Sequence, residues 1–173
     1  WQGIYMSLIG GLAILFAIPF AEPIFQWIGH SPQVQQHEVE YFRILCVGSF
    51  FYIATFALSG FFSGRGKTWP VMWVNVATTF VNLTLDYALV FGKWGLPELG
   101  IRGAGYATVA AGVFSFLLFM GILAAGTTNR TYHTISGWRF DGELFLRLLR
   151  YGFPSGVQFF LEMTGFTGFI LVV

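Results

Sequence analysis

Five long apolar segments limit the folds open to this chain more than any other feature of its sequence. They cover about residues 3–20, 41–62, 69–92, 103–125 and 153–173. Each comes close to or exceeds the roughly 20 residues that a helix needs to cross the hydrocarbon core of a bilayer. Only 10% of the 173 residues are charged, whereas about 25% is usual for a soluble domain. The sequence therefore predicts an all-α protein, a polytopic transmembrane helix bundle in contact with membrane lipid.

The charged residues between these segments predict how the helices are oriented. Arg65 and Lys67 follow the second segment, and four arginines lie in or beside the connection before the fifth: Arg130, Arg139, Arg147 and Arg150. The opposite side mixes acidic and basic residues, from Glu22 to Arg102. Because cytoplasmic loops carry an excess of Lys and Arg, we expect the two basic connections to be cytoplasmic. The protein is then a multi-pass protein of the cell's inner (plasma) membrane.

Small residues, Asp141 and the chain ends support three further expectations. Gly60 with Gly64, and Gly152 with Gly156, form GxxxG patterns that allow membrane helices to approach closely. Asp141 starts an amphipathic turn before the fifth segment. The chain begins at Trp1 and ends in apolar residues, so we expect an internal piece of a longer chain.

Asp86 is the only charged residue in the third segment, and a carboxylate inside a membrane costs a few kcal/mol or more on insertion scales. Asn82 lies one helical turn before it, so both side chains point the same way and offer oxygen atoms to a cation or a proton. A structural alternative is that Asp86 caps a helix or pairs with an arginine. The functional interpretation is a site for a coupling ion, Na⁺ or H⁺.

Glu162 is the second acidic residue within an apolar segment. Gln158 lies one turn before it and is a possible additional ligand, and such oxygen ligands suit a hard cation such as Na⁺. The alternative is a protonated acid that is hydrogen-bonded to a neighbouring helix. Thr108 on the fourth segment offers a further oxygen ligand for the ion. The alternative is that its hydroxyl is hydrogen-bonded to the backbone of its own helix.

Several other classes of function are excluded or disfavoured. A net charge of +1 gives no case for a nucleic-acid partner, and the single Cys46 permits no intrachain disulfide. The basic turn at residues 64–68 lacks the spacing and the preceding strand of a phosphate-binding loop. We find no catalytic constellation and no bound cofactor motif, so we expect a protein that is not an enzyme.

The run from Ser63 to Thr108 resembles the multidrug and toxic compound extrusion (MATE) family, in its NorM-like branch. The resemblance rests on the Gly-rich basic turn, Pro70, the motif Asn82-x-x-Leu85-Asp86-Tyr87, and the Gly-rich connection that follows. A second matching block runs from Gly152 to Glu162. The resemblance covers essentially the whole chain.

This resemblance implies a fold of about twelve helices in two six-helix lobes. Residues 1–125 would form the third to sixth helices of the first lobe, residues 126–150 a cytoplasmic linker with an amphipathic helix, and residues 151–173 the first helix of the second lobe. The family's cation or proton site carries over to Asn82, Asp86 and Thr108, and its seventh-helix glutamate to Glu162. Its fourth-helix asparagine falls near Ser59.

The function implied is a cation-coupled antiporter that exports amphipathic organic cations, including drugs, with Na⁺ or H⁺ as the coupling ion. This chain would act together with the missing helices of the full-length protein. One alternative is a lipid-linked saccharide flippase of the same superfamily, whose anionic substrate calls for Arg or Lys in the cavity. The other is a non-transporting membrane scaffold, which needs no buried acids.

Overall fold

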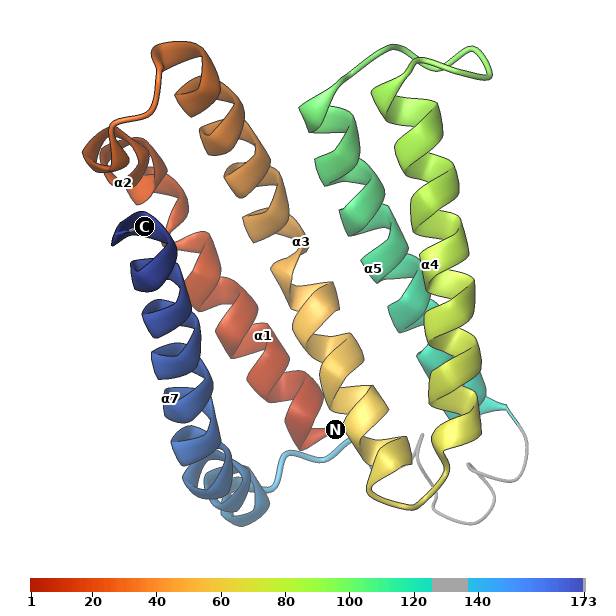
Figure 1. Ribbon diagram of the computed structural model, residues 1–173. Helices are drawn as coiled ribbons and strands as arrows, with labels where there is room; N and C mark the ends of the chain where they lie inside the picture. Colours follow the sequence, from red (N-terminus) through yellow and green to blue (C-terminus); the bar gives the residue numbers. More distant parts are fainter. Residues whose placement is uncertain (126–136, 173) are drawn as a thin grey trace.

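A computed structural model describes residues 1–125 and 137–172 of the chain, and these residues fold into long helices (Figure 1). The elements are α1 (Gln2–Leu15), the short 3₁₀ helix η1 (Ile18–Phe20), α2 (Ala21–Ile28), α3 (Pro32–Ser63), α4 (Thr68–Val90), α5 (Ile101–Ala124) and α7 (Gly142–Val172). The described residues contain no β-strand. The predicted all-α fold is confirmed.

The long helices stand side by side in the order α7, α1, α3, α5, α4 (Figure 1). Each of the inner helices packs on the two beside it, and α4 also touches α3. The chain therefore places α4 and α7 at opposite ends of the row. Residues on these two helices do not share a site within the described chain.

Helices occupy all five positions that the sequence predicts, but they differ in polarity. By length and composition, three helical stretches in the described residues are apolar enough to cross a membrane: Gln2–Ile28, Pro32–Ser63 and Ile101–Ala124. The 23 residues of α4 would extend about 35 Å, which is long enough to span. Polar residues on one of its faces make α4 less apolar than its neighbours.

The segment between the first two predicted spans is more helical than expected. We expected a polar connection over residues 22–40, but α2 fills its first part and α3 already begins at Pro32. The first span is also interrupted, since α1 ends at Leu15. Pro19 explains this end, because it has no N–H to donate to the Leu15 carbonyl four residues earlier.

The start of α7 follows the prediction for Asp141. Its carboxylate Oδ1 accepts hydrogen bonds from the backbone N–H groups of Glu143 (3.0 Å) and Leu144 (3.1 Å). Such a cap satisfies donors that the first helical turn leaves free. From there α7 continues without a break past residue 150, where the linker was predicted to meet the span. Arg130 and the rest of residues 126–136 lie outside the described residues.

Close helix packing occurs at glycines other than those in the GxxxG patterns. A Cβ built on Gly48 of α3 would lie 2.4 Å from Cγ2 of Val109 on α5, whereas one built on Gly60 would meet nothing within 4 Å. Gly152 and Gly156 are equally open. Within the described chain, Gly60, Gly152 and Gly156 face no neighbouring helix, so the expectation that these patterns mark helix contacts stays a prediction for helices outside it.

A small apolar core joins α3, α4 and α5 near the turn at residues 64–67. Its buried members are Leu58, Phe62, Val74, Phe119 and Leu123. The rings of Phe62 and Phe119 stack with centroids 5.7 Å apart. Most other large apolar side chains are exposed, as expected of helices that face lipid or further helices.

Candidate functional site

One face of α4 carries nearly all of its polar side chains. Asn75 lies three and four residues before the adjacent Thr78 and Thr79, Asn82 lies four and three residues after them, and Asp86 follows four residues later. These spacings place all five side chains on the same side of the helix. From Asn75 to Asp86 this polar face extends about 16 Å along the helix axis. The apolar residues between them point to the other sides, and Phe80 is 71% exposed there.

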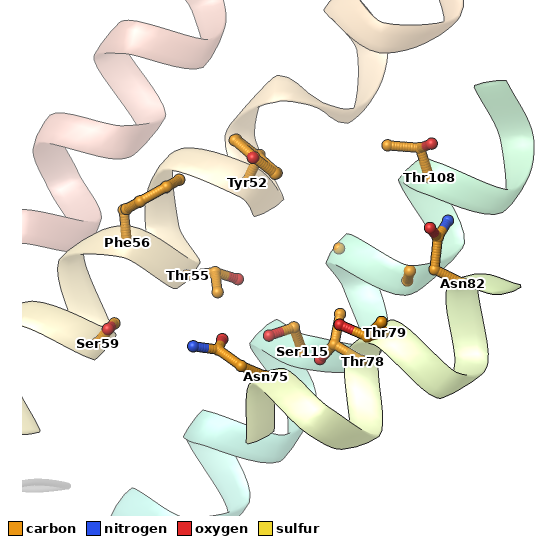
Figure 2. A pocket seen from close by; sticks show the side chains of 12 residues that line it. Tyr52, Thr55, Phe56, Ser59, Asn75, Thr78, Thr79, Asn82, Thr108 and Ser115 are labelled. Atoms are coloured by element: carbon orange, nitrogen blue, oxygen red, sulfur yellow. The ribbon is translucent and has the colours of Figure 1, made fainter. Parts of the chain in front are cut away.

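The polar face of α4 borders a cavity of about 410 Å³ between α3, α4 and α5 (Figure 2). Hydroxyl and amide side chains supply most of its polar surface, and no charged residue lines it. Its lining consists of Tyr52, Thr55, Phe56, Ser59, Asn75, Thr78, Thr79, Asn82, Thr108, Ala111, Gly112 and Ser115. The cavity therefore carries hydroxyl and amide groups but no charge, and most of its surface is apolar.

Three polar atoms at this cavity are buried and have no hydrogen-bond partner among the described residues. They are Oγ1 of Thr55 on α3, and Oγ1 of Thr78 and Nδ2 of Asn82 on α4. A buried polar group without a partner costs about 1–3 kcal/mol. Groups of this kind are normally satisfied by protein, water or a ligand. These atoms belong to residues on two walls of the cavity but lie beneath its surface.

Asp86 lies one turn beyond Asn82, near the end of α4, and is half-buried outside the cavity lining. Its Oδ1 atom is buried and accepts no hydrogen bond in the described chain, and no salt bridge to Asp86 occurs there. The alternative of a pairing with arginine is therefore not seen in residues 1–125 and 137–172. Asp86 is not a helix cap either, since α4 ends through Phe91.

Two acidic residues at the same end of the bundle are, in contrast, paired with arginines. Glu22 binds Arg43 at 2.8 Å, and Glu40 binds Arg102 through an Nε–Oε2 hydrogen bond of 2.6 Å. Glu38 contacts Nδ1 of His30 at 2.8 Å. Asp86 thus differs from Glu22 and Glu40 in having no counter-charge among the described residues.

Thr108 and Ser59 both line the cavity, from α5 and α3 respectively. The Thr108 hydroxyl donates to the carbonyl oxygen of Ala104 in its own helix at 2.9 Å. This is the structural alternative that the sequence offered for Thr108. Its oxygen can still accept a hydrogen bond, because a hydroxyl that donates retains two lone pairs.

Glu162 lies on α7, far along the row of helices from Asp86 (Figure 1). Its side chain is exposed, and Nε2 of Gln158 donates to its Oε1 at 2.9 Å. The structure therefore brings Gln158 to Glu162, as the one-turn spacing predicts. It does not bring either residue to Asp86, and in this chain Glu162 is not shielded from its surroundings.

Sequence reasoning missed Asn75, Thr78, Thr55 and Ser115 as members of the site. The two α4 residues carried a usable signal, since they lie seven and four residues before Asn82 on the same helical face. Thr55 and Ser115 carried none, because only the packing of α3 and α5 against α4 reveals which faces meet.

Comparisons with known proteins agree with this arrangement. The MatE family model matches residues 1–88. A protein of Thermotoga maritima named "Probable multidrug resistance protein NorM" is 27% identical over 95% of this chain and 35% of its own length. A protein of the same name from Bradyrhizobium diazoefficiens is 30% identical over 99% of this chain and 37% of its own length. The chain thus spans about a third of the length of these relatives.

A solved structure has the same fold. It is described as the "Inward-facing conformation of a multidrug resistance MATE family transporter of the MOP superfamily". It superposes with a TM-score of 0.73 and 24% identity, over 88% of this chain and 34% of that chain. Since a family model covers residues 1–88 and relatives match almost the entire chain, the chain belongs to the MatE family of integral membrane transporters.

Proposed function

We propose that this chain, together with the further helices that the length of its relatives implies, forms a cation-coupled antiporter. It would export amphipathic organic cations, including drugs, across the inner (plasma) membrane. Na⁺ or H⁺ moving inward would be the coupling ion and would bind at Asp86. The names of the relatives support the export of drugs, since they describe probable multidrug resistance proteins.

The observation that carries this proposal is the unpaired carboxylate of Asp86. Two other acids at that end of the bundle, Glu22 and Glu40, have arginine partners, whereas Asp86 has no cationic partner in the described residues. A carboxylate in a medium of low dielectric constant carries a large desolvation cost, which binding of a proton or a cation removes by neutralising its charge. Reversible occupation by a mobile cation satisfies that need, and this exchange is what an ion-coupled carrier requires.

The uncharged lining of the cavity favours a drug antiporter over the flippase alternative. A lipid-linked saccharide carries an anionic pyrophosphate, which basic side chains recognise best. No Lys or Arg is among the twelve residues that line the cavity. The scaffold alternative gives no reason for an unpaired acid beside a polar cavity.

The charge balance of the exchange determines its driving force. Each net elementary charge that moves inward across 100 mV releases about 2.3 kcal/mol, a concentration ratio of roughly fiftyfold, because about 1.4 kcal/mol equals a factor of ten. Exchange of one inward Na⁺ or H⁺ for one outward monovalent organic cation moves no net charge, so the concentration gradient of the coupling ion would drive it.

Glu162 remains a second proposed ion site, which further helices beside α7 would complete. Residues 1–125 and 151–173 are accordingly proposed to belong to different lobes, joined by the linker at 126–150. Helices absent from this chain would close the site around Asp86.

Drug efflux by the full-length protein in reconstituted vesicles tests the proposal. We expect Asp86→Asn to abolish coupled efflux or reduce it at least tenfold, and Asp86→Asn with Glu162→Gln to abolish it. Glu22→Gln is the matched control, since it removes the charge of a paired, exposed acid and should leave efflux near the wild-type rate. Wild-type efflux by the double variant would overturn the proposal.

A further inference from the structure

The arginines at the two ends of the bundle differ in their partners. At the end that contains α2, two arginines each bind a glutamate, Arg43 to Glu22 and Arg102 to Glu40. At the opposite end, Arg139 and Arg150 form no ion pair within residues 1–125 and 137–172. Residues 126–136 contain no Asp or Glu that could pair with them. The charge of these two guanidinium groups is therefore available to an anion from outside the described chain.

The first turns of α7 are amphipathic. Arg147 lies four residues after Glu143 and three before Arg150, so their side chains share one side of the helix. Nη2 of Arg147 is 3.9 Å from Oε1 of Glu143, and both side chains are largely exposed, so this pair is weak. Another side of the helix is apolar and consists of Leu144, Phe145, Leu148 and Leu149. A basic side next to an apolar side is typical of helices at a membrane surface.

Two side chains of α1 hold the segment that leads into α7. Nε2 of Gln2 donates to the carbonyl oxygen of Arg139 at 3.0 Å, and the Tyr5 hydroxyl donates to the carbonyl oxygen of Trp138. The rings of Tyr5 and Phe140 meet edge to face, with centroids 5.8 Å apart. Because both hydrogen bonds use backbone oxygens, the side chains of Trp138 and Arg139 stay exposed. These contacts fix the basic start of α7 to the end of a helical stretch that is apolar enough to cross a membrane.

The turn between α3 and α4 brings further cations to this end of the bundle. Figure 1 shows that this turn and the start of α7 lie at the same end. The turn contains Arg65 and Lys67. With the three arginines at positions 139, 147 and 150, five basic residues of the described chain lie at this end. Clusters of four to eight Lys and Arg beside a membrane helix attract anionic lipids.

We propose that this basic end of the bundle binds anionic phospholipids, whose headgroups contact Arg147 and Arg150 while their acyl chains lie against the apolar side of α7. A guanidinium group donates two parallel hydrogen bonds to phosphate oxygens. The exposed indole of Trp138 suits the headgroup level of a membrane. A lipid meets both sides of the helix, whereas a free anion would contact only the arginines. This lipid site goes beyond ion coupling and does not depend on Asp86.

Quenching of a fluorophore on α7 by nitroxide-labelled lipid tests the proposal in the full-length protein. All native cysteines, Cys46 included, are replaced, and bimane is attached to Leu148→Cys on the exposed apolar side of the helix. The protein is reconstituted into vesicles of phosphatidylcholine that contain either phosphatidylglycerol or phosphatidylethanolamine with a nitroxide on the acyl chain. The two quenching curves give the preference for the anionic over the zwitterionic lipid at this site. Bimane on Phe80→Cys, on the exposed side of α4, is the control position.

We expect phosphatidylglycerol to be preferred at least fivefold at Leu148→Cys and less than twofold at Phe80→Cys. One basic residue near a membrane surface changes the affinity for anionic lipid roughly fivefold. Arg147→Gln/Arg150→Gln should therefore reduce the preference at Leu148→Cys at least fivefold. An equal preference at the two positions would overturn the proposal, as would an unchanged preference in this double variant.

Two matched variants test whether the effect comes from charge at this end of the bundle. Arg43→Gln/Lys93→Gln removes the same two charges from the opposite end and should leave the preference at Leu148→Cys unchanged. Arg147→Lys/Arg150→Lys keeps both charges and should retain at least half of the preference. A loss in the first variant as large as that in Arg147→Gln/Arg150→Gln, or a complete loss in the second, would overturn the assignment to these arginines.

Inorganic phosphate and salt distinguish a lipid surface from a site for a free anion. An excess of inorganic phosphate, at constant ionic strength, should not relieve the quenching by phosphatidylglycerol. Relief of the quenching would assign the arginines to a soluble anion instead and would overturn the lipid proposal. High salt should weaken the preference, because exposed charges are screened, and a preference that is independent of salt would contradict its electrostatic origin.

Discussion

Gly48 is the position at which one added methyl group should have the clearest effect on the fold. An alanine Cβ there would lie 2.4 Å from Cγ2, 3.0 Å from Cγ1 and 3.1 Å from Cβ of Val109. Favourable contacts between carbon atoms lie near 3.5–4.0 Å, so α3 and α5 must separate or Val109 must leave its rotamer. Val109 is β-branched and therefore stiff at χ1. Overpacking of this kind costs about 1–3 kcal/mol.

Gly60→Ala on the same helix provides the matched comparison, because its new Cβ meets nothing within 4 Å. Both substitutions gain up to about 1 kcal/mol of helix propensity, so the difference between them isolates the steric cost. We expect Gly48→Ala to be less stable than Gly60→Ala by about 1–3 kcal/mol. The measurement is the free energy of unfolding of the full-length protein in detergent, followed by tryptophan fluorescence.

The double variant Gly48→Ala/Val109→Ala tests the named contact, because it removes both γ carbons of Val109. We expect a double-mutant cycle to show that Val109→Ala recovers most of the loss caused by Gly48→Ala. Equal stability of Gly48→Ala and Gly60→Ala, or a cycle without coupling, would refute the assignment of this glycine to the α3–α5 contact.

Three further predictions concern stability. Arg102→Glu should lower the midpoint temperature of thermal unfolding, because it places two carboxylates together. The exchanged pair Glu40→Arg/Arg102→Glu should restore that temperature, and a double variant as unstable as Arg102→Glu would contradict the ion pair. Asp141→Ala should cost about 1 kcal/mol locally and speed hydrogen exchange of the first-turn amides of α7, and unchanged exchange would argue against the cap. Phe119→Ala should destabilise by about 3–5 kcal/mol, measured by denaturant unfolding against Phe80→Ala on the exposed side; equal losses would contradict the buried stack.

Much of the fold could be predicted from local sequence. The helix positions follow from apolar length, and the start of α7 follows from Asp141, because caps and apolar periodicity act within a few residues. The shared direction of Asn82 and Asp86 also follows from helical geometry alone. Each of these features depends on one helix at a time.

Features that depend on two helices could not be predicted in the same way. Gly48 and Gly60 look alike in sequence, yet of the two only Gly48 meets another helix. It lies on the face of α3 that packs against α5, whereas Gly60 lies outside that face although Phe62 beside it contacts α5. The cavity has the same origin, since Thr55 and Ser115 enter the site through helix packing. The early start of α3 was missed because the charges of residues 37–43 suggested a loop, whereas ion pairs to α2 and α5 accommodate them on a helix.

The length of α3 has a practical consequence. Its 32 residues extend about 48 Å, while the hydrocarbon core of a bilayer is about 30 Å thick. Roughly the first three turns therefore stand in the headgroup region or in water, on the side predicted to be external. This rigid extension of α3 is a suitable attachment site for a fusion partner. An antibody fragment or epitope fused near Gln35 would add mass for single-particle imaging of a small transporter and would leave the cavity between α3, α4 and α5 uncovered.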